Sequence, residues 1–124
     1  MLNLPPSVRI FVATQPVDLR KAIDGLAALV VDILDQSPYT GHLFVFYGRP
    51  RDRVKLLVWD RSGFWLFYKR LEKSRFLFPK ADSASCEMDS TELTLLLDGL
   101  DPALAERAPR LRPRLFPRSI PGEA

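Results

Sequence analysis

Arginine side chains are concentrated around two short turns that the sequence predicts. Gly48, Pro50 and Asp52 are turn-forming residues, and arginines occupy the positions between and beside them. Turns lie at the surface, so their guanidinium groups can reach the phosphate oxygens of a nucleic acid. We therefore predict phosphate contacts from this turn, from the turn at 60–63 and from the adjoining strands, made by Arg49, Arg51, Arg53, Lys55, Arg61, Lys69 and Arg70.

Aromatic residues are interleaved with these cations and offer a second kind of contact. Alternation along the predicted strand 64–71 places Trp65 on one face and Tyr68 on the other. One face must pack on the core, and the other can present a ring to an unpaired base or to a protein partner. We predict Trp65 or Tyr68 as an interface anchor. The alternative is an ordinary core role, because aromatic residues on strands are usually buried.

Residue types that carry catalysis or bind metals are scarce. His42 is the only histidine and Cys86 the only cysteine, so no histidine and cysteine set for a metal exists in the sequence. Cys86 lies among acids, which raise a thiol pKa. His42, at a strand start, is expected to be structural or to make a surface contact. A carboxylate pocket would need Asp18 and Asp60 close together. We expect no catalytic residue, no metal and no cofactor, and therefore no enzyme.

Composition and charge limit the class of protein. A chain of 124 residues with 47% apolar residues fits one domain with a modest core. One cysteine excludes an internal disulfide, and no apolar run reaches the roughly 18 residues of a membrane helix, so we expect a cytoplasmic protein. Residues 43–80 hold ten basic and three acidic groups, whereas residues 81–106 hold seven acids and no lysine or arginine. This segregation favours a polyanionic partner for the middle of the chain.

Apolar periodicity predicts the elements that position these groups. A main helix is expected over 18–34, with Asp18 at its start, and a C-terminal helix over 91–100. Residues 80–89 are interpreted as a polar linker. Strands are predicted at 8–13, 43–47, 53–59 and 64–71, with a short further strand at 76–78.

The short connections between these strands favour antiparallel pairing. The expected fold is therefore α+β, with a small, mostly antiparallel sheet of three to four strands. The main helix should pack on this sheet and the C-terminal helix should lie at its edge. We assign residues 1–101 to this single domain and residues 102–124 to a flexible tail rich in proline and arginine.

Three stretches of the sequence resemble a known family. They are PVDLRKAIDGLAALV (16–30), GHLFVFYGRPRDRVKLLVWDRSGFWLFYKRLEKSRFLFP (41–79) and LTLLLDGLD (93–101). The chain from Val8 to Asp101 resembles the TnpB-type accessory proteins of IS66-family insertion sequences, which are unrelated to the RNA-guided nucleases of the same label. The resemblance implies a protein made beside a separate, catalytic transposase and needed for, or assisting, transposition. It does not extend to the tail.

These observations lead to one hypothesis and one alternative. The hypothesis is a non-catalytic accessory protein of DNA transposition that binds DNA at the element ends and assists assembly of the transposase complex. The alternative is a protein-interaction module that binds the transposase without contacting DNA, using its aromatic anchors and the acidic segment. A homo-oligomer is compatible with both.

Overall fold

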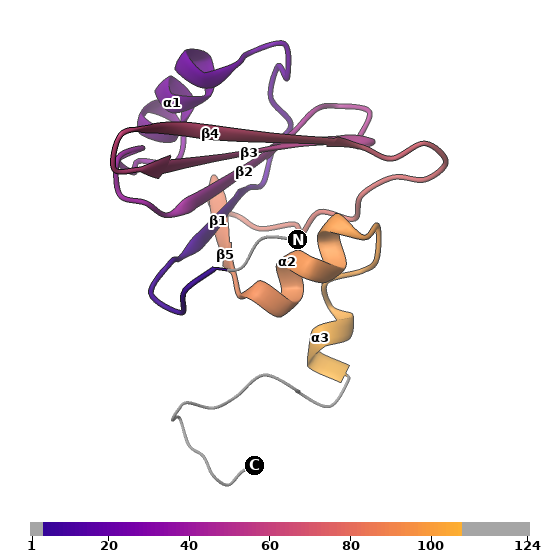
Figure 1. Cartoon of the computed structure of the whole chain (residues 1–124). Helices are drawn as coiled ribbons and strands as arrows, with labels where there is room; N and C mark the ends of the chain where they lie inside the picture. Colours follow the sequence, from indigo (N-terminus) through magenta and orange to yellow (C-terminus); the bar gives the residue numbers. More distant parts are fainter. Residues whose placement is uncertain (1–3, 108–124) are drawn as a thin grey trace, which may run out of the picture.

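The fold is a five-stranded mixed sheet with helices on both faces (Figure 1). The computed structural model describes residues 4–107 of the chain. The strand order across the sheet is β4-β3-β2-β1-β5. β1 and β2 pair in parallel, with α1 as the crossover between them, and all other neighbours are antiparallel. The elements are β1 (Ile10–Ala13), α1 (Ile23–Asp32), β2 (Leu43–Tyr47), β3 (Arg53–Asp60), β4 (Gly63–Arg70), β5 (Ser85–Met88), α2 (Ser90–Leu97) and α3 (Leu104–Arg107).

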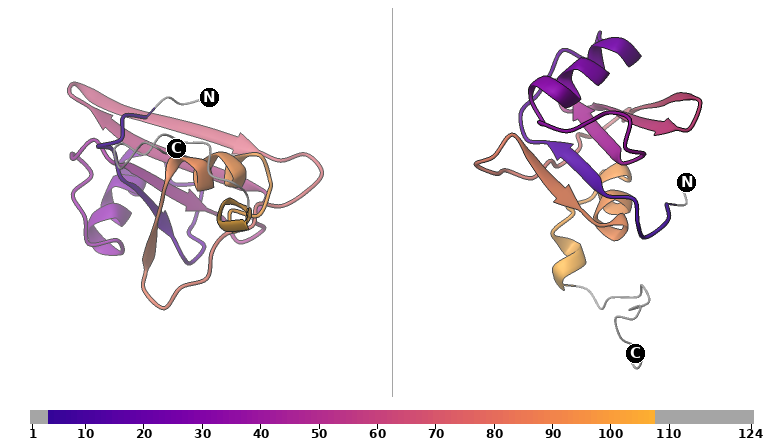
Figure 2. Two further views of the ribbon diagram at one scale, coloured as in Figure 1. Left: turned by 90° about the horizontal axis from the view of Figure 1, so that it is seen from below. Right: turned by 90° about the vertical axis from the view of Figure 1, so that its left-hand side faces the viewer.

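The central strands are apolar on both faces, and this is why the sheet lies between two layers of helix. Successive side chains of a strand point to opposite faces. Phe11 of β1 packs with Leu26 and Val30 of α1, whereas Val12 packs on the other face with Leu96 of α2. Every residue of β1 and β2 is buried, as strands covered on both faces require. Figure 2 shows α1 on one side of the sheet and α2 on the other.

The α+β class is confirmed, but the sheet is larger and less regular than the sequence predicted. It has five strands instead of three to four. Three of its four strand pairs are antiparallel, as a mostly antiparallel sheet requires, and β1 and β2 form the one parallel pair among the described residues. The fifth strand, β5, lies in the segment interpreted as a polar linker, where Cys86 pairs with Val12. β5 has four residues with only Met88 buried, so it carries no apolar run. Residues 76–78 form no strand; Phe76 enters the core from an irregular segment.

The helices also differ from the prediction in position. α1 begins at Ile23, and Asp18 does not cap it; its carboxylate instead accepts a hydrogen bond from the backbone N–H of Arg20, in the loop before the helix. α2 begins and ends within three residues of the predicted 91–100. It packs on the face of the sheet opposite α1, not at the edge, because its apolar side chains enter the core. These buried residues are Leu93, Leu96 and Leu97.

A capping box starts α2 and gives the first testable prediction. The Asp89 carboxylate accepts a hydrogen bond from the Glu92 N–H at 2.8 Å, and the Glu92 carboxylate accepts one from the Asp89 N–H at 3.0 Å. We expect Asp89→Ala to lower the free energy of unfolding by about 1 kcal/mol in chemical denaturation. Asp98→Ala, at the other end of the helix, is the control and should change it by less than about 0.5 kcal/mol. Equal losses would contradict the prediction.

The segment assigned to a tail begins inside the described part of the chain. α3 lies in it, and Ala105 is buried. Residues 108–124 lie outside the described residues, so the flexible tail stays a prediction. Within residues 4–107, no helix is long and apolar enough to cross a membrane.

Candidate nucleic-acid interface

One end of the sheet collects most of the predicted arginines. β1, β2 and β4 end there and β3 begins there, because Tyr47 pairs with Val54 and Arg53 pairs with Arg70. The turn between β2 and β3 adds Arg49 and Arg51, and β4 leads into the loop that projects at the right of Figure 1. We term this region the basic end. It consists of residues 14–22, 48–53 and 69–82, which hold ten basic and four acidic side chains.

Arg61 lies at the opposite end of the β3–β4 hairpin. Asp60 pairs with Gly63, so Arg61 and Ser62 form the hairpin turn, and Arg61 adopts a φ of 51°. At about 3.3 Å per residue, the length of β3 separates Arg61 from Arg53 by roughly 25 Å. The structure therefore brings Arg49, Arg51, Arg53 and Arg70 to one end and leaves Arg61 apart from them.

Two of the side chains that the sequence predicts to contact phosphate, Lys55 and Lys69, donate hydrogen bonds to backbone carbonyls. Lys55 Nζ donates to the Leu19 carbonyl at 2.7 Å and to the Lys21 carbonyl at 2.9 Å, so it fixes the loop that leads into α1. Lys69 Nζ donates to the Leu97 carbonyl at 2.7 Å, in the last turn of α2, where a cation also suits the helix dipole. Both ammonium groups stabilise the fold, and a phosphate contact by either stays a prediction.

The bond from Lys69 to α2 predicts a stability effect without a change in fold. Lys69→Met keeps the aliphatic stem and removes the ammonium group, which leaves the Leu97 carbonyl without this donor. We expect the free energy of unfolding to fall by about 1 kcal/mol. Lys73→Met is the matched control, because the Lys73 side chain makes no hydrogen bond or ion pair within residues 4–107; it should change stability by less than about 0.5 kcal/mol. An unchanged free energy of unfolding in Lys69→Met would show that this hydrogen bond does not stabilise the fold in solution.

The arginines of the basic end keep most of their donors available. Arg53 Nε lies 3.6 Å from an Asp52 carboxylate oxygen, and Arg70 Nε lies 3.1 Å from one of Glu72. The Arg49 side chain makes no ion pair or hydrogen bond to any described residue. A guanidinium group has five N–H donors, so one contact leaves several for a ligand.

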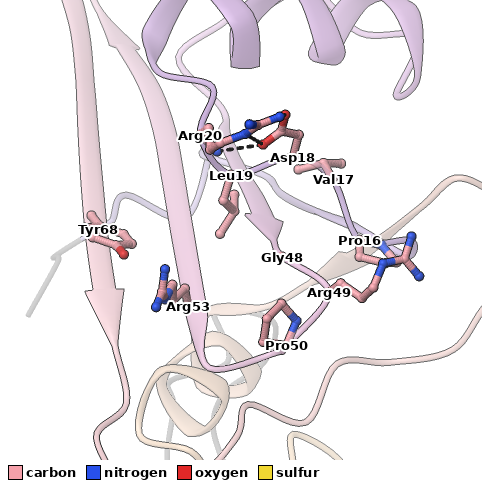
Figure 3. Close-up of a pocket in the computed structure, with 10 residues that line it drawn as sticks. All are labelled: Pro16, Val17, Asp18, Leu19, Arg20, Gly48, Arg49, Pro50, Arg53 and Tyr68. Atoms are coloured by element: carbon pink, nitrogen blue, oxygen red, sulfur yellow. Dashed lines mark hydrogen bonds and ion pairs between the residues drawn. The ribbon is translucent and has the colours of Figure 1, made fainter.

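A pocket of about 460 Å³ opens among these arginines (Figure 3). It lies between the loop after β1 and the turn after β2, beside β4. Ligands of open α/β sheets commonly bind beyond the carboxyl ends of the strands, and this pocket has that position relative to the parallel pair β1 and β2. The lining residues are Pro16, Val17, Asp18, Leu19, Arg20, Gly48, Arg49, Pro50, Arg53 and Tyr68.

An ion pair at the rim of the pocket fixes the charge state of Asp18. Arg20 Nε and Nη2 donate to the two Asp18 carboxylate oxygens, with the shortest contact 2.8 Å, and the Arg20 backbone N–H donates as well. The Arg20 side-chain hydrogen bonds, followed by the backbone bond, lower the pKa of Asp18 to about 2. Asp18 therefore stays a carboxylate well below its ordinary pKa of 3.8, and the two side chains orient each other.

The lowered pKa of Asp18 predicts a pH dependence with a defined sign. The pKa in the folded state is below its ordinary value of 3.8, so the stability that the pair contributes is complete at neutral pH and is lost as the pH falls from about 4 toward 2. We expect an NMR titration of the Asp18 carboxyl carbon to have its midpoint near pH 2. Arg20→Gln should return the midpoint toward 3.8. A midpoint near 3.8 in the unmodified chain would show that the pair does not persist in solution.

Trp65 and Tyr68 are exposed on opposite faces of β4. Trp65 is 56% exposed, and its indole N–H donates to Asp60 at 2.5 Å, toward the hairpin turn. Tyr68 is 55% exposed, lines the pocket, and has Lys55 Nζ 5.4 Å from its ring centroid. Of the two predicted anchors, only Tyr68 is part of the basic-end pocket.

The carboxylates that a catalytic pocket would need are not brought together. Asp18 lines the pocket at the basic end, whereas Asp60 lies at the far end of β3. Within residues 4–107, no group of three or more His, Cys, Asp or Glu side chains is placed to hold a metal ion. A carboxylate site built on Asp18 and Asp60 is therefore excluded by the geometry.

Cys86 and His42 have structural surroundings. Burial, and secondarily the Glu92 carboxylate, raise the pKa of the Cys86 thiol, which confirms the direction predicted from its acidic neighbours and identifies burial as the main cause. His42 Nδ1 accepts a hydrogen bond from the Arg9 backbone N–H at 2.9 Å, which ties the start of β2 to the residue before β1.

Arg20 and the loop before α1 are the part of the pocket that the sequence did not indicate. The apolar spacing from Leu19 onward is typical of a helix, so the sequence predicts Arg20 on a helix, whereas the structure has it in a loop. The available signal was Pro16 followed by Asp18, which is typical of a turn. Recognition of β1 and β2 as a parallel pair would have placed this loop beside the turn 48–52.

The fold and the site together define a layered α+β domain. Its arginine-lined pocket lies at the carboxyl ends of the parallel pair β1 and β2. The model of the family described as IS66 Orf2-like protein matches residues 8–107, and the chain belongs to this family. It is similar to two proteins of Sinorhizobium fredii (strain NBRC 101917 / NGR234), both named as uncharacterized. With y4jC it shares 42% identity over 113 residues, 91% of this chain and 97% of the relative, and with y4hO 37% over 101 residues, 82% and 88%. No solved structure matches the chain.

The family places the chain among transposition-associated accessory proteins of insertion sequences. The resemblance inferred from the three sequence stretches is thereby confirmed, and the matched region extends it to residue 107.

Proposed function

We propose that this protein is a non-catalytic accessory factor of transposition that binds DNA through its basic end and assists assembly of the transposase complex in the cytoplasm. Family membership supports the process, and the position of the arginines supports the DNA contact. The proposal assigns phosphate contacts to Arg49, Arg51, Arg53 and Arg70, and adds Arg20.

The observation that carries this proposal is the convergence of arginines from separate parts of the chain. Arg20 comes from the loop after β1, Arg49 and Arg51 from the turn after β2, and Arg53 and Arg70 from paired positions of β3 and β4. Solvation alone does not require five guanidinium groups at one end of a small sheet. Phosphate groups repeat along a duplex, and a contiguous basic surface neutralises several of them together.

The test is a titration of duplex DNA carrying the element ends at several salt concentrations. Five phosphate contacts should give a plot of log affinity against log salt with a slope of about −4.5. Duplex of unrelated sequence reports how much of the affinity is specific. Absence of binding at about 50 mM salt would overturn the proposal.

A second candidate function is direct binding of the transposase without DNA contact. It is favoured by Trp65, which is 56% exposed on β4, a strand at the edge of the sheet. Exposed tryptophans often anchor protein interfaces. A pull-down with the transposase after nuclease digestion separates the two functions. A complex that survives digestion and is lost in Trp65→Ala supports this candidate. A complex that is lost on digestion argues against it.

A further inference from the structure

The basic-end pocket has the composition of an anion site. Arg20, Arg49 and Arg53 are three of its ten lining residues, and Asp18 is the only acid among them. Asp18 is already paired with Arg20. The lining therefore carries an excess of two positive charges around one cavity.

This charge excess fits a phosphomonoester better than a phosphodiester. A terminal phosphate carries about −1.5 to −2 charges at neutral pH, whereas an internal phosphodiester carries about −1. The Asp18 carboxylate accepts hydrogen bonds from the Arg20 Nε–H and from one Nη2–H, which leaves three N–H donors on Arg20. The pairing also restricts the Arg20 side chain, so less conformational entropy is lost when an anion binds.

The remaining surface of the pocket suits a nucleoside. Figure 3 shows Leu19 between the Asp18–Arg20 pair and Pro50, with Tyr68 and Arg53 on one side and Arg49 toward Pro16. Leu19 and Pro50 give an apolar wall, and the Tyr68 ring offers a face for stacking. A volume of about 460 Å³ is within the usual range for small-molecule sites and exceeds what a phosphate group alone fills.

We propose that this pocket binds a nucleotide through its terminal phosphate, with Arg20 and Arg53 on the phosphate and Tyr68 against the base. This inference deepens the proposed function and rests on it for the source of the nucleotide, which is the phosphorylated end of a DNA strand. A free nucleoside monophosphate has the same chemistry, and the experiment distinguishes the two sources.

The experiment measures binding of a fluorescent single-stranded hexanucleotide with either a 5′-phosphate or a 5′-hydroxyl group. We expect the phosphorylated strand to bind the full chain at least tenfold more tightly. Arg53→Gln should remove most of this difference. Deoxyadenosine monophosphate and inorganic phosphate are added as competitors to identify what the pocket recognises.

Gly48→Val tests the cavity without changing any charge. A Cβ at Gly48 would lie 3.5 Å from Leu19 and 3.7 Å from Pro50, so a small side chain is tolerated and a larger one occupies the pocket. We expect this variant to lose the preference for the 5′-phosphate while its melting temperature stays within a few degrees. Arg61→Gln, at the far end of the hairpin, is the control and should keep the preference.

The outcomes separate this inference from the proposed function. If both pocket variants lose the preference for the 5′-phosphate, the inference is supported and the source is a strand end. If deoxyadenosine monophosphate displaces the phosphorylated hexanucleotide at equal concentration, the pocket assignment is supported and the source is a free nucleotide. Equal affinity for both hexanucleotides overturns the inference, even if duplex DNA still binds in the salt titration. Conversely, a 5′-phosphate preference without duplex binding would overturn the proposed function and leave the pocket assignment intact.

Discussion

Phe76→Ala should lower the free energy of unfolding by about 3–5 kcal/mol. Phe76 is 1% exposed and packs in the core on the α2 side of the sheet, although it lies in an irregular segment. Its removal leaves a cavity and frees the connection between β4 and β5. The Phe76 N–H donates to the Arg51 carbonyl at 2.7 Å, so the same anchor holds the turn that carries the arginines.

The neighbouring Leu77 is a matched control for this measurement. Its side chain is 50% exposed, so Leu77→Ala should cost less than about 1 kcal/mol. Urea denaturation of both variants gives the comparison. Similar losses from the two would mean that the connection does not insert Phe76 into the core in solution.

Phe76 also shows why part of the fold could not be predicted. A short apolar run bounded by charged residues and a proline is typical of a strand, and the sequence does not reveal whether its backbone pairs with a neighbour. β5 shows the opposite case, because Glu87 and Ser85 interrupt its apolar pattern and β1 supplies the pairing. Long strands rich in aliphatic and aromatic residues, such as β3 and β4, agree with the prediction to within one residue, because their own residues and the turn between them determine the pattern.

The parallel pairing of β1 and β2 was missed for a related reason. Short connections favour antiparallel neighbours, and those after β2 and β3 fit this rule. The connection from β1 to β2 contains a whole helix, in the predicted order as in the structure, and such a connection permits a parallel crossover. The prediction of strand direction used only the short connections, so it assigned no direction to this pair. β1 and β2 are buried at every position, and such continuous apolar strands are typical of parallel pairs covered on both faces.

The sequence predicts which types of residue form the candidate site better than it predicts their positions relative to one another. Alternation correctly placed Trp65 and Tyr68 on opposite faces, and turn chemistry correctly placed Arg49 and Arg51 in a turn. Sequence could not indicate that Lys55 reaches across the sheet to backbone carbonyls, because such bonds depend on tertiary packing. The sequence also could not indicate that Arg61 lies far from the other arginines, because this distance depends on the register of the β3–β4 hairpin.

The separation of arginines between the two ends of the sheet predicts different effects from two variants with equal changes in charge. Arg49→Gln with Arg53→Gln neutralises two cations at the basic end. Each phosphate contact contributes about 0.9 to the salt slope, so we expect the slope to fall by about 2 and the affinity for duplex DNA to drop roughly 50-fold at 0.1 M salt. Fluorescence anisotropy at four or more salt concentrations measures both quantities.

Arg9→Gln with Arg61→Gln is the charge-matched control. Arg61 lies in the turn at the far end of the hairpin, and Arg9 precedes β1 at that same end, where it forms an ion pair of 2.7 Å with Glu87. If the basic end binds DNA, this variant should keep the slope within about one unit of the unmodified chain. Because both variants lose the same net charge, a general electrostatic effect would weaken them equally. Equal weakening would therefore contradict a localised interface and assign DNA binding to the overall charge of the domain.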